Sequence, residues 1–468
     1  GRRAGRMLLR QAARTLRAQA ARAPGTPLFA SNPGPQAHAR QFINASALPA
    51  QAEAPGHARD YGKTPDAVMG RIVSPVTNEL WLRRQEMKAK MEGPNAAILT
   101  PQTKLIPKPP TEQSMVYAFT SNPELVEEYK NPWGFVRMGR LLEDLDSLAG
   151  NIAYGHCDDN DATTRPLLIV TAGVDRIALD HPLNFESDMV LAGKVVYTGR
   201  TSMEIRMTIT NAEGCALRAH FHFVARDPTT GKGAPVNPVA PAAPEDVELY
   251  ERAKKRAEVK KAQRAAGEAP DVAVAREKWK EGVLAEAMLH RDMPALAPGD
   301  SMLLRSTRQE HNLICQPQSR NMHGRIFGGF LMRRAFEIAF TTAYTHAGSR
   351  PSFLQVGDIS FQRAVDVGDL LCITADVLSA DRDETTTLAS STTKGEYNVI
   401  HVQVIATVRK PETRTSFTTN TLDFSFATEA MSKDGERLPL KRIIPDTPFA
   451  ADRIWRALNK VKGTYLPF

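Results

Sequence analysis

Hydrophobic and polar residues alternate along two separate stretches of the chain. Apolar residues fill every second position in residues 203–209 and again in residues 402–408. A period of two is typical of strands with one face in a core. Upstream of each stretch, residues 141–152 carry one apolar stripe at helical spacing, and residues 330–339 are apolar almost all round. The pattern predicts a largely buried helix followed by antiparallel strands, twice.

These stretches belong to an internal repeat with an offset of 190 residues. Residues 131–150, NPWGFVRMGRLLEDLDSLAG, align with residues 321–340, NMHGRIFGGFLMRRAFEIAF. Identical or similar residues meet at Asn131/Asn321, Gly134/Gly324, Val136/Ile326, Gly139/Gly329, Leu141/Leu331 and Ala149/Ala339. TRPLLIVTAGVDRI then follows the first copy and SRPSFLQVGDISF the second. The order of matches predicts two copies of one α+β domain, each a curved antiparallel sheet wrapped around a central helix.

Prolines and charged runs divide the rest of the chain. We expect a leader at 1–42, an N-terminal extension at 43–104, domains at 105–230 and 301–430, a linker at 231–300 and a C-terminal segment at 431–468. The extension is rich in Ala and Pro, with one expected helix near LWLRRQEMKAKM. The linker joins a Pro-rich stretch to a highly charged helix, whose basic run is typical of a solvated face.

The net charge of +8 comes from the leader alone. Residues 1–42 contain eight arginines and neither lysine nor acid, and without them 52 basic residues face 52 acidic ones. Spaced arginines around a few apolar residues are typical of a mitochondrial transit peptide, which predicts a matrix location. The alternative is a basic tail that binds nucleic acid or anionic lipid. The neutral remainder predicts no nucleic-acid partner, and no apolar run reaches the about 18 residues of a membrane span.

Cysteine and histidine spacing predicts neither a disulfide framework nor a metal site. The chain has four widely spaced cysteines, Cys157, Cys215, Cys315 and Cys372. They fit a reducing compartment and small buried side chains. His220 and His222 point the same way along a predicted strand, but no third ligand accompanies them, so we expect no metal.

Several segments resemble a known family: NMHGRIFGGFLMRRAFEIAF, GRLLEDLDSLAG, VTAGVDRI, GRTSMEIRM and SRPSFLQVGDISFQRAVDVGDLL. They are similar to the two hotdog domains of mitochondrial acyl-CoA thioesterases, in particular the acyl-CoA thioesterase 9 branch, over residues 104–426. The resemblance implies a hydrolase that releases free fatty acid and coenzyme A from acyl-CoA without a cofactor. It also implies that the two hotdogs pair edge to edge, each helix facing the other domain's loop, and that such pairs form a trimer-like homo-oligomer.

Thioester hydrolysis needs donors for an oxyanion, and two adjacent glycines offer them. At a helix start, Gly328 and Gly329 let backbone N–H groups approach a ligand, and the helix dipole favours negative charge there. We expect the oxyanion hole at Gly328, Gly329 and the N–H of Phe330. A tight loop with close helix packing explains the glycines equally well.

The general base should be a carboxylate at a helix edge, and Asp146 is the candidate. Small residues lie one turn away from it, whereas Glu143 and Asp144 are expected in the first turn, where acids suit the helix dipole. Asp146 also falls where related thioesterases carry their catalytic Asp, as the resemblance implies. We expect it to activate water, with attack through an anhydride as a variant. An acid without a chemical role is the alternative.

The two copies differ at these positions. The first copy keeps Asp146 but has Met138 where the second has Gly328, and the second copy has Phe336 opposite Asp146. If each helix faces the other domain's loop, only Asp146 with residues 321–329 makes a complete site.

Further candidates surround that site. Asn321 is expected to orient the water or the thioester carbonyl, or else to cap its own loop. His323 and Glu337 are secondary candidates, because the first copy has Trp133 in place of the histidine and Glu337 lies one residue off the register of Asp146. Coenzyme A carries phosphates, so basic and hydroxyl groups should bind it: Arg200, Thr201, Ser202, Arg325 and Arg333. Any one of these arginines alone is typical of a surface.

Two other functions are alternatives to thioester hydrolysis. A hotdog dehydratase or hydratase would need an Asp or His pair within one loop and helix, which neither copy has. A catalytically silent structural or CoA-sensing subunit of a mitochondrial assembly would use the extension, the linker helix and the basic segment DRIWRALNKVKG.

Overall fold

The computed structural model describes residues 82, 99–102, 104–161, 163–266, 268–321, 324–380, 397–430 and 440–464. All of them belong to one structural unit, Thr64–Phe468. The expected leader at 1–42, nearly all of the extension at 43–104 and the secondary candidate His323 lie outside the described residues.

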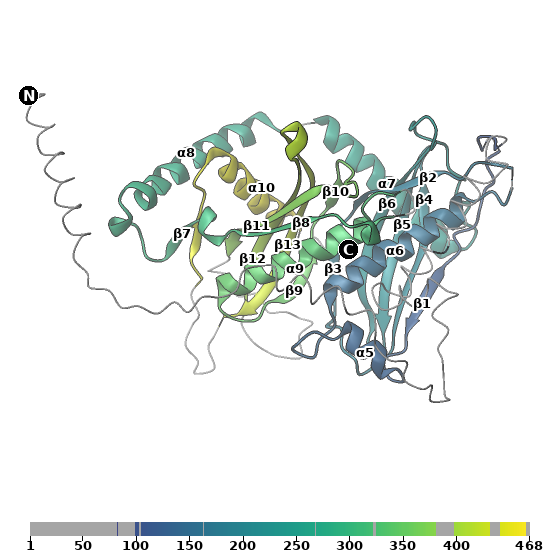
Figure 1. Cartoon of the computed structure of the whole chain (residues 1–468), viewed down its shortest axis with the longest axis horizontal. Coiled ribbons are helices and arrows are strands. Elements are labelled where there is room, and N and C mark those ends of the chain that lie inside the picture. The colour runs from purple at the N-terminus through teal and green to yellow at the C-terminus, as the bar shows by residue number, and fades with distance from the viewer. Residues whose placement is uncertain are drawn as a thin grey trace, which may run out of the picture. The chain divides into compact units, whose positions relative to one another are not determined.

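Two helices of 20 residues lie at the centre of the described chain (Figure 1). Helix α6 spans Met138–Cys157 and α9 spans Gly328–Ala347, so their starts are 190 residues apart, as the repeat predicts. Because Met138 is already helical, Glu143 and Asp144 lie in the second turn of α6, and the expectation that they occupy the first turn is wrong. Asp144 is instead a buried acceptor for the Tyr117 hydroxyl, at 2.8 Å, and for the Tyr129 hydroxyl.

The loop before each helix is built in the same way. The side-chain oxygen of Asn131 accepts a hydrogen bond from the backbone N–H four residues later at 3.0 Å, and that of Asn321 does so at 3.1 Å. Gly134 and Gly324 both adopt left-handed backbone conformations, with φ of 83° and 80°. Glycine takes this conformation without steric penalty. The repeat in the sequence is therefore a repeat of backbone geometry.

One 12-stranded antiparallel sheet wraps around both helices. Its first half runs in the order β1 (Gln113–Tyr117), β4 (Met189–Thr198), β5 (Ser202–Asn211), β6 (Gly214–Arg226) and β2 (Leu168–Val174). Its second half runs β10 (Ile359–Phe361), β13 (Thr415–Glu429), β12 (Tyr397–Lys410), β11 (Leu370–Ala380) and β8 (Gln309–Ile314). The alternating stretches found in the sequence lie in β5 and β12, and their apolar residues are buried.

The halves of the sheet meet edge to edge. Strand β2 pairs with β10, and β3 (Ile177–Leu179) pairs with β9 (Ser352–Val356). Val174 of the first copy pairs with Ile359 of the second, and Ile177 of the first copy pairs with Val356 of the second. Because Val174 is equivalent to Val356 and Ile177 to Ile359, the same contact occurs twice with the two copies exchanged. The two halves are therefore related by an approximate twofold axis between α6 and α9. This is an α+β tandem hotdog fold, as expected.

Helices cover the face of the sheet that points away from α6 and α9. The linker contains two of them, α7 (Pro244–Ala266) and α8 (Pro270–Asp292), rather than the single helix expected, and α10 (Pro448–Thr464) joins them. A salt bridge of 2.6 Å between Lys194 and Asp246 holds α7 against β4. Trp279 on α8 packs on Trp455 of α10, with ring centroids 5.4 Å apart.

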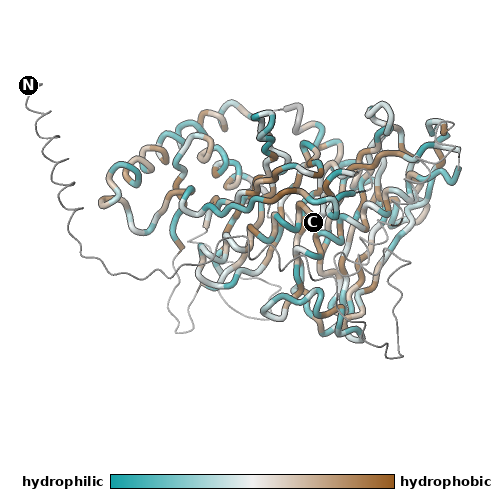
Figure 2. The backbone as a smooth tube through the Cα atoms, in the orientation of Figure 1, coloured by the Kyte–Doolittle hydropathy of each residue, from teal (hydrophilic) through white to brown (hydrophobic). Residues whose placement is uncertain are grey.

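The remaining described elements are short. Helix α5 (Pro123–Tyr129) precedes the first loop, and β7 (Ser301–Leu303) pairs in parallel with β14 (Arg442–Ile444). Figure 2 shows hydrophobic segments concentrated along the central strands and mixed hydropathy along the long linker helices. In the described part of the chain, no helix is both long and apolar enough to cross a membrane.

Candidate active site

Asp146 lies on α6, where the N-terminus of α9 presses against it. Its side chain is buried, with 1% of the residue exposed. A Cβ atom on Gly328 would lie 2.9 Å from Asp146 Oδ2, so any larger residue at that position would force the carboxylate to shift. The structure thus brings together the acid of the first copy and the glycines of the second.

The second glycine serves the packing of the two helices. A Cβ atom on Gly329 would lie 2.9 Å from the carbonyl oxygen of Glu143, and one on Gly139 would lie 3.5 Å from that of Arg333. These two approaches are equivalent under the approximate twofold axis. Glu143 and Arg333 are equivalent positions too, and their side chains form a salt bridge of 3.0 Å. Close helix packing, the alternative explanation of the glycine pair, therefore applies to Gly329.

Thr171 on β2 holds the other side of the carboxylate. Its hydroxyl donates a hydrogen bond to Asp146 Oδ1 at 3.1 Å. Thr171 was not among the residues predicted from the sequence. A polar residue inside the apolar run LLIVTAGV was the available signal, but nothing in the sequence places it against α6.

The environment of Asp146 gives its carboxyl an unusual proton affinity. The pKa of Asp146 is raised to about 7, chiefly by burial and to a smaller extent by the nearby Glu143, although the Thr171 hydroxyl and the Gly329 N–H act to lower it. Oδ2 has no hydrogen-bond partner of normal geometry among the described residues, so the Gly329 N–H acts on the carboxylate as a nearby dipole. A carboxyl with a pKa near 7 takes up and releases a proton near neutral pH.

The first turn of α9 supplies backbone donors on the side of the carboxylate where the Gly329 N–H lies. The first residues of α9, Gly328, Gly329 and Phe330, have N–H groups with no acceptor inside the helix, because an α-helix leaves its first N–H groups unpaired. The helix dipole adds partial positive charge at the same place. The site therefore combines a proton acceptor with donors suited to a developing negative charge.

The other predicted site residues have different surroundings. Asn321 uses its side-chain oxygen to cap its own loop, as Asn131 does in the first copy. Arg333 is engaged by Glu143 and by Glu337, the latter at 3.0 Å. Arg334 also pairs with Glu337, at 2.9 Å, so this secondary candidate is held by two guanidinium groups. Arg325 is exposed and lies 3.7 Å from Asp366.

The segment with Arg200, Thr201 and Ser202 lies at the start of β5. Thr171 pairs with Phe223, which pairs with Met203, so this segment is two strands, or about 10 Å, from Thr171. It lies at the same end of the sheet as the Asp146 carboxylate. Arg200 is exposed there, but no hydrogen bond joins the segment to Asp146 among the described residues.

His220 and His222 do not converge on a common point. His220 Nδ1 lies 2.9 Å from Glu204, and His222 Nε2 lies 2.8 Å from Asp175. Each histidine thus faces its own carboxylate on the outer side of β6. Arg256 of α7 also binds Glu204, and Lys260 of the same helix binds Asp175.

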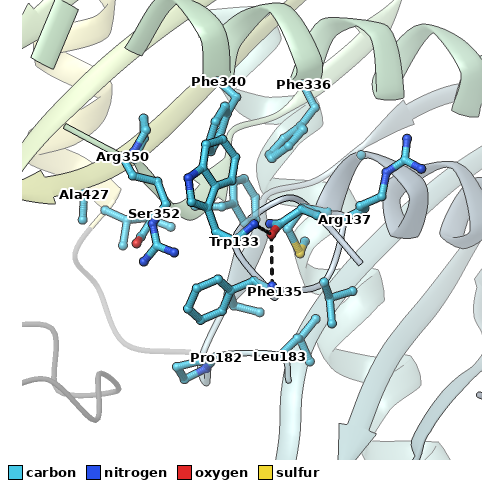
Figure 3. A pocket seen from close by; sticks show the side chains of 18 of the residues that line it. Trp133, Phe135, Arg137, Pro182, Leu183, Phe336, Phe340, Arg350, Ser352 and Ala427 are labelled. Atoms are coloured by element: carbon cyan, nitrogen blue, oxygen red, sulfur yellow. Dashed lines mark hydrogen bonds between the residues drawn. The ribbon is translucent and has the colours of Figure 1, made fainter. Parts of the chain in front are cut away.

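A pocket, called the second pocket below because it lies at the second of the two related positions, is related to the Asp146 site by the approximate twofold axis. It has a volume of about 710 Å³ and lies between residues 131–140 and α9 (Figure 3). Phe336 lines it at the position equivalent to Asp146. The strand pairing makes Phe353 equivalent to Thr171. The rings of Phe336 and Phe353 pack with their centroids 5.6 Å apart. An aromatic pair thus replaces the carboxylate and hydroxyl.

Comparison with known proteins agrees with these features. No family model matches the chain. Acyl-coenzyme A thioesterase 2, chloroplastic, from Humulus lupulus is 41% identical over 403 residues, which cover 83% of this chain and 89% of that protein. Acyl-coenzyme A thioesterase 9, mitochondrial, from Homo sapiens is 35% identical over 322 residues, which cover 66% of this chain and 69% of that protein.

Solved structures of low sequence identity are also similar. An acyl-CoA hydrolase from Staphylococcus aureus is 19% identical, has a TM-score of 0.29 and covers 35% of this chain and 91% of its own. A putative oleoyl thioesterase from Lactobacillus plantarum is 11% identical, has a TM-score of 0.38 and covers 68% of this chain and 97% of its own. The assignment rests on the sequence relatives: this chain belongs to the acyl-CoA thioesterase family of thioester hydrolases, as its two glycine-loop and helix segments predict.

Proposed function

We propose that the chain hydrolyses acyl-CoA thioesters to free fatty acid and coenzyme A, with Asp146 as the general base. The observation that supports this most directly is the position of Asp146: a buried carboxyl with a pKa of about 7, packed against the N-terminus of α9. A base with a pKa near the working pH is present in its acceptor form and still binds a proton strongly.

The proposed reaction begins when Asp146 takes a proton from a water molecule. The water oxygen attacks the thioester carbonyl carbon, and the negative charge that forms on the carbonyl oxygen accepts hydrogen bonds from the N–H groups of Gly328, Gly329 and Phe330. The carbon–sulfur bond then breaks, and the proton held by Asp146 passes to the departing sulfur. Thr171 positions the carboxylate throughout, since its hydroxyl binds the oxygen Oδ1.

Direct attack by Asp146 on the thioester, forming an anhydride, is the variant. A single turnover in ¹⁸O-labelled water detects an anhydride that water opens at its aspartyl carbonyl. General-base catalysis places the label in the fatty acid at the first turnover. An anhydride opened by water at its aspartyl carbonyl leaves the first fatty acid unlabelled and the label in Asp146.

Coenzyme A is proposed to lie across the start of β5. Arg200 is exposed at this strand end, with Thr201 and Ser202 beside it, and Arg325 is exposed in the loop before α9. Guanidinium and hydroxyl groups bind phosphate oxygens well. Arg333 contributes less directly, because Glu143 and Glu337 already occupy its guanidinium. The reaction as proposed needs no cofactor.

Location and assembly are proposals that rest on other observations. The relatives named above are mitochondrial in one case and chloroplastic in the other, and the arginine-rich residues 1–42 favour the mitochondrial matrix. Import of the labelled chain into isolated mitochondria, with cleavage near Phe42, tests this. Limited proteolysis tests the proposed domain limits at 105–230 and 301–430. The mass of the protein in solution tests the proposed trimer of double hotdogs.

The central test measures coenzyme A release from acyl-CoA substrates of short, medium and long chain. We expect turnover with at least one of them, and a loss of about 10²- to 10⁴-fold in kcat for Asp146→Asn. Phe336→Leu, at the equivalent position of the other site, is the matched control and should keep full activity. No turnover with any chain length would favour the silent-subunit alternative, and an unimpaired Asp146→Asn would refute the proposed base.

A further inference from the structure

The second pocket is a mainly apolar cavity beside the helix pair. Its walls carry seven aromatic side chains, Trp133, Phe135, Phe336, Phe340, Tyr344, Phe353 and Tyr397. Figure 3 shows Phe336 and Phe340 pointing from α9 toward Trp133, with Phe135 across the cavity. Its volume of about 710 Å³ falls within the about 300 to 1,000 Å³ of ordinary small-molecule sites.

This pocket lacks the groups that the proposed hydrolysis needs. Phe336 and Phe353 replace the carboxylate and the hydroxyl, and Met138 stands where Gly328 makes room for Asp146. Phe336 continues into a cluster with Phe424 and Phe426, both at centroid distances of 6.0 Å. The floor of the pocket is therefore hydrocarbon, which binds an apolar chain and transfers no proton.

Arginine and glutamate side chains line one part of the otherwise apolar pocket. The Arg350 guanidinium lies 4.4 Å from the centre of the Phe135 ring and has no carboxylate partner among the described residues. Arg137 also lines the pocket, and burial together with the like charges of Arg333 and Arg140 lowers its pKa. Glu337 is already neutralised by two arginines. Glu429 also lines the pocket, but no salt bridge joins it to Arg350 among the described residues, so the Arg350 guanidinium can pair with a ligand.

The rim also differs from that of the Asp146 site. The strand pairing makes Tyr397 and Glu429, which line this pocket, equivalent to Arg200 and Arg226 near the Asp146 site. Replacing two arginines by a phenol and a carboxylate removes phosphate donors and adds negative charge. A ligand with several phosphates is disfavoured there, whereas one carboxylate facing Arg350 is not.

We propose that the second pocket binds a free fatty carboxylate without transforming it. The aliphatic chain packs among the aromatic rings, and the carboxylate pairs with Arg350. The inference goes beyond the proposed hydrolysis and does not depend on it, because it uses neither Asp146 nor the glycines of α9. Fatty acid binding and thioester turnover can therefore fail separately.

The test uses the whole chain and a fluorescent polyene fatty acid whose absorption overlaps tryptophan emission, since Trp133 lies in the pocket. We expect saturable energy transfer that palmitate competes away. Arg350→Glu should weaken binding at least about tenfold, and Arg350→Lys should restore most of it. Ser352→Trp fills the pocket from β9 and should abolish the energy transfer, while the rate of acyl-CoA hydrolysis stays that of the wild type.

Controls separate this site from other lipid binding. Arg363 stacks over Phe417 at 5.0 Å, much as Arg350 does over Phe135, but does not line the pocket, so Arg363→Glu should leave binding unchanged. A fatty alcohol of the same length should bind more weakly than the acid. Binding that persists in both Arg350→Glu and Ser352→Trp, or displacement of the probe by free coenzyme A at equal potency, would overturn the proposal.

Discussion

The buried carboxyl of Asp146 should make the folded chain less stable as the pH rises. Its pKa is about 7 in the folded chain, against an ordinary value of about 3.9 when unfolded. Below about pH 4 the group is protonated in both states and imposes no penalty. Between about pH 4 and 7 only the unfolded state loses the proton, so folding stability falls by up to about 4 kcal/mol, at about 1.36 kcal/mol per pH unit.

Asp146→Asn removes this penalty, because an amide has nearly the same shape and no charge. We expect the variant to gain up to about 4 kcal/mol in free energy of unfolding at pH 8 and almost nothing at pH 4. The stabilised variant should also be the inactive one, as is common where an active site stores unfavourable electrostatics.

The assay is urea unfolding of both proteins at several values between pH 4 and 8, compared as a difference at each pH. Asp188→Asn is the control, since its exposed carboxylate accepts a hydrogen bond from the Thr120 N–H at 2.8 Å and its pKa is lowered rather than raised. That variant should not be stabilised at pH 8. A constant difference between wild type and Asp146→Asn across the whole range would refute the argument.

Three further outcomes follow from the same geometry. Gly329→Ala should destabilise the fold by about 1–3 kcal/mol, because the new Cβ would meet the Glu143 carbonyl oxygen. Gly282→Ala in α8 is the control and should be neutral or stabilising, since open space surrounds that position. Equal thermal midpoints for the two variants would contradict this. Thr171→Val should raise the pKa of Asp146 and move the acidic limb of the kcat/KM profile to higher pH, while Thr171→Ser leaves it in place. Arg333→Met should lower stability by about 3–5 kcal/mol through an unpaired Glu143, and Glu143→Gln added to it should recover part of the loss, as a double-mutant cycle would measure.

Local sequence was a good guide to the elements and to their duplication. The two loop and helix segments recur at an offset of 190 residues, and α6 and α9 begin at that spacing. Asn131 and Asn321 cap their loops alike because a short amide side chain and a left-handed glycine are local requirements. The start of α6 was misplaced by about one turn, since helix ends depend on contacts outside the helix.

The candidate site was predictable only in part. Asp146 and Gly328 could be selected from the repeat, but their contact depends on a crossing of two helices far apart in the sequence. Thr171 went unnoticed because a threonine in a strand is ordinary until its neighbour across the core is known. The two linker helices were read as one solvated helix, since the charges that hold α7 to the sheet are indistinguishable in sequence from a surface face.

The sequence by itself determined the periodicity, the duplication and the asymmetry between an acid in one copy and a phenylalanine in the other. Only the tertiary structure decided what these differences do. The two copies meet edge to edge around an approximate twofold axis, so each helix faces the loop of the other copy. Where α6 meets the start of α9, the Asp146 carboxyl is buried and its pKa is raised. Where α9 meets the loop of the first copy, an aromatic pocket lined by Phe336 remains. The two sites differ because burial and electrostatics depend on which surfaces come together.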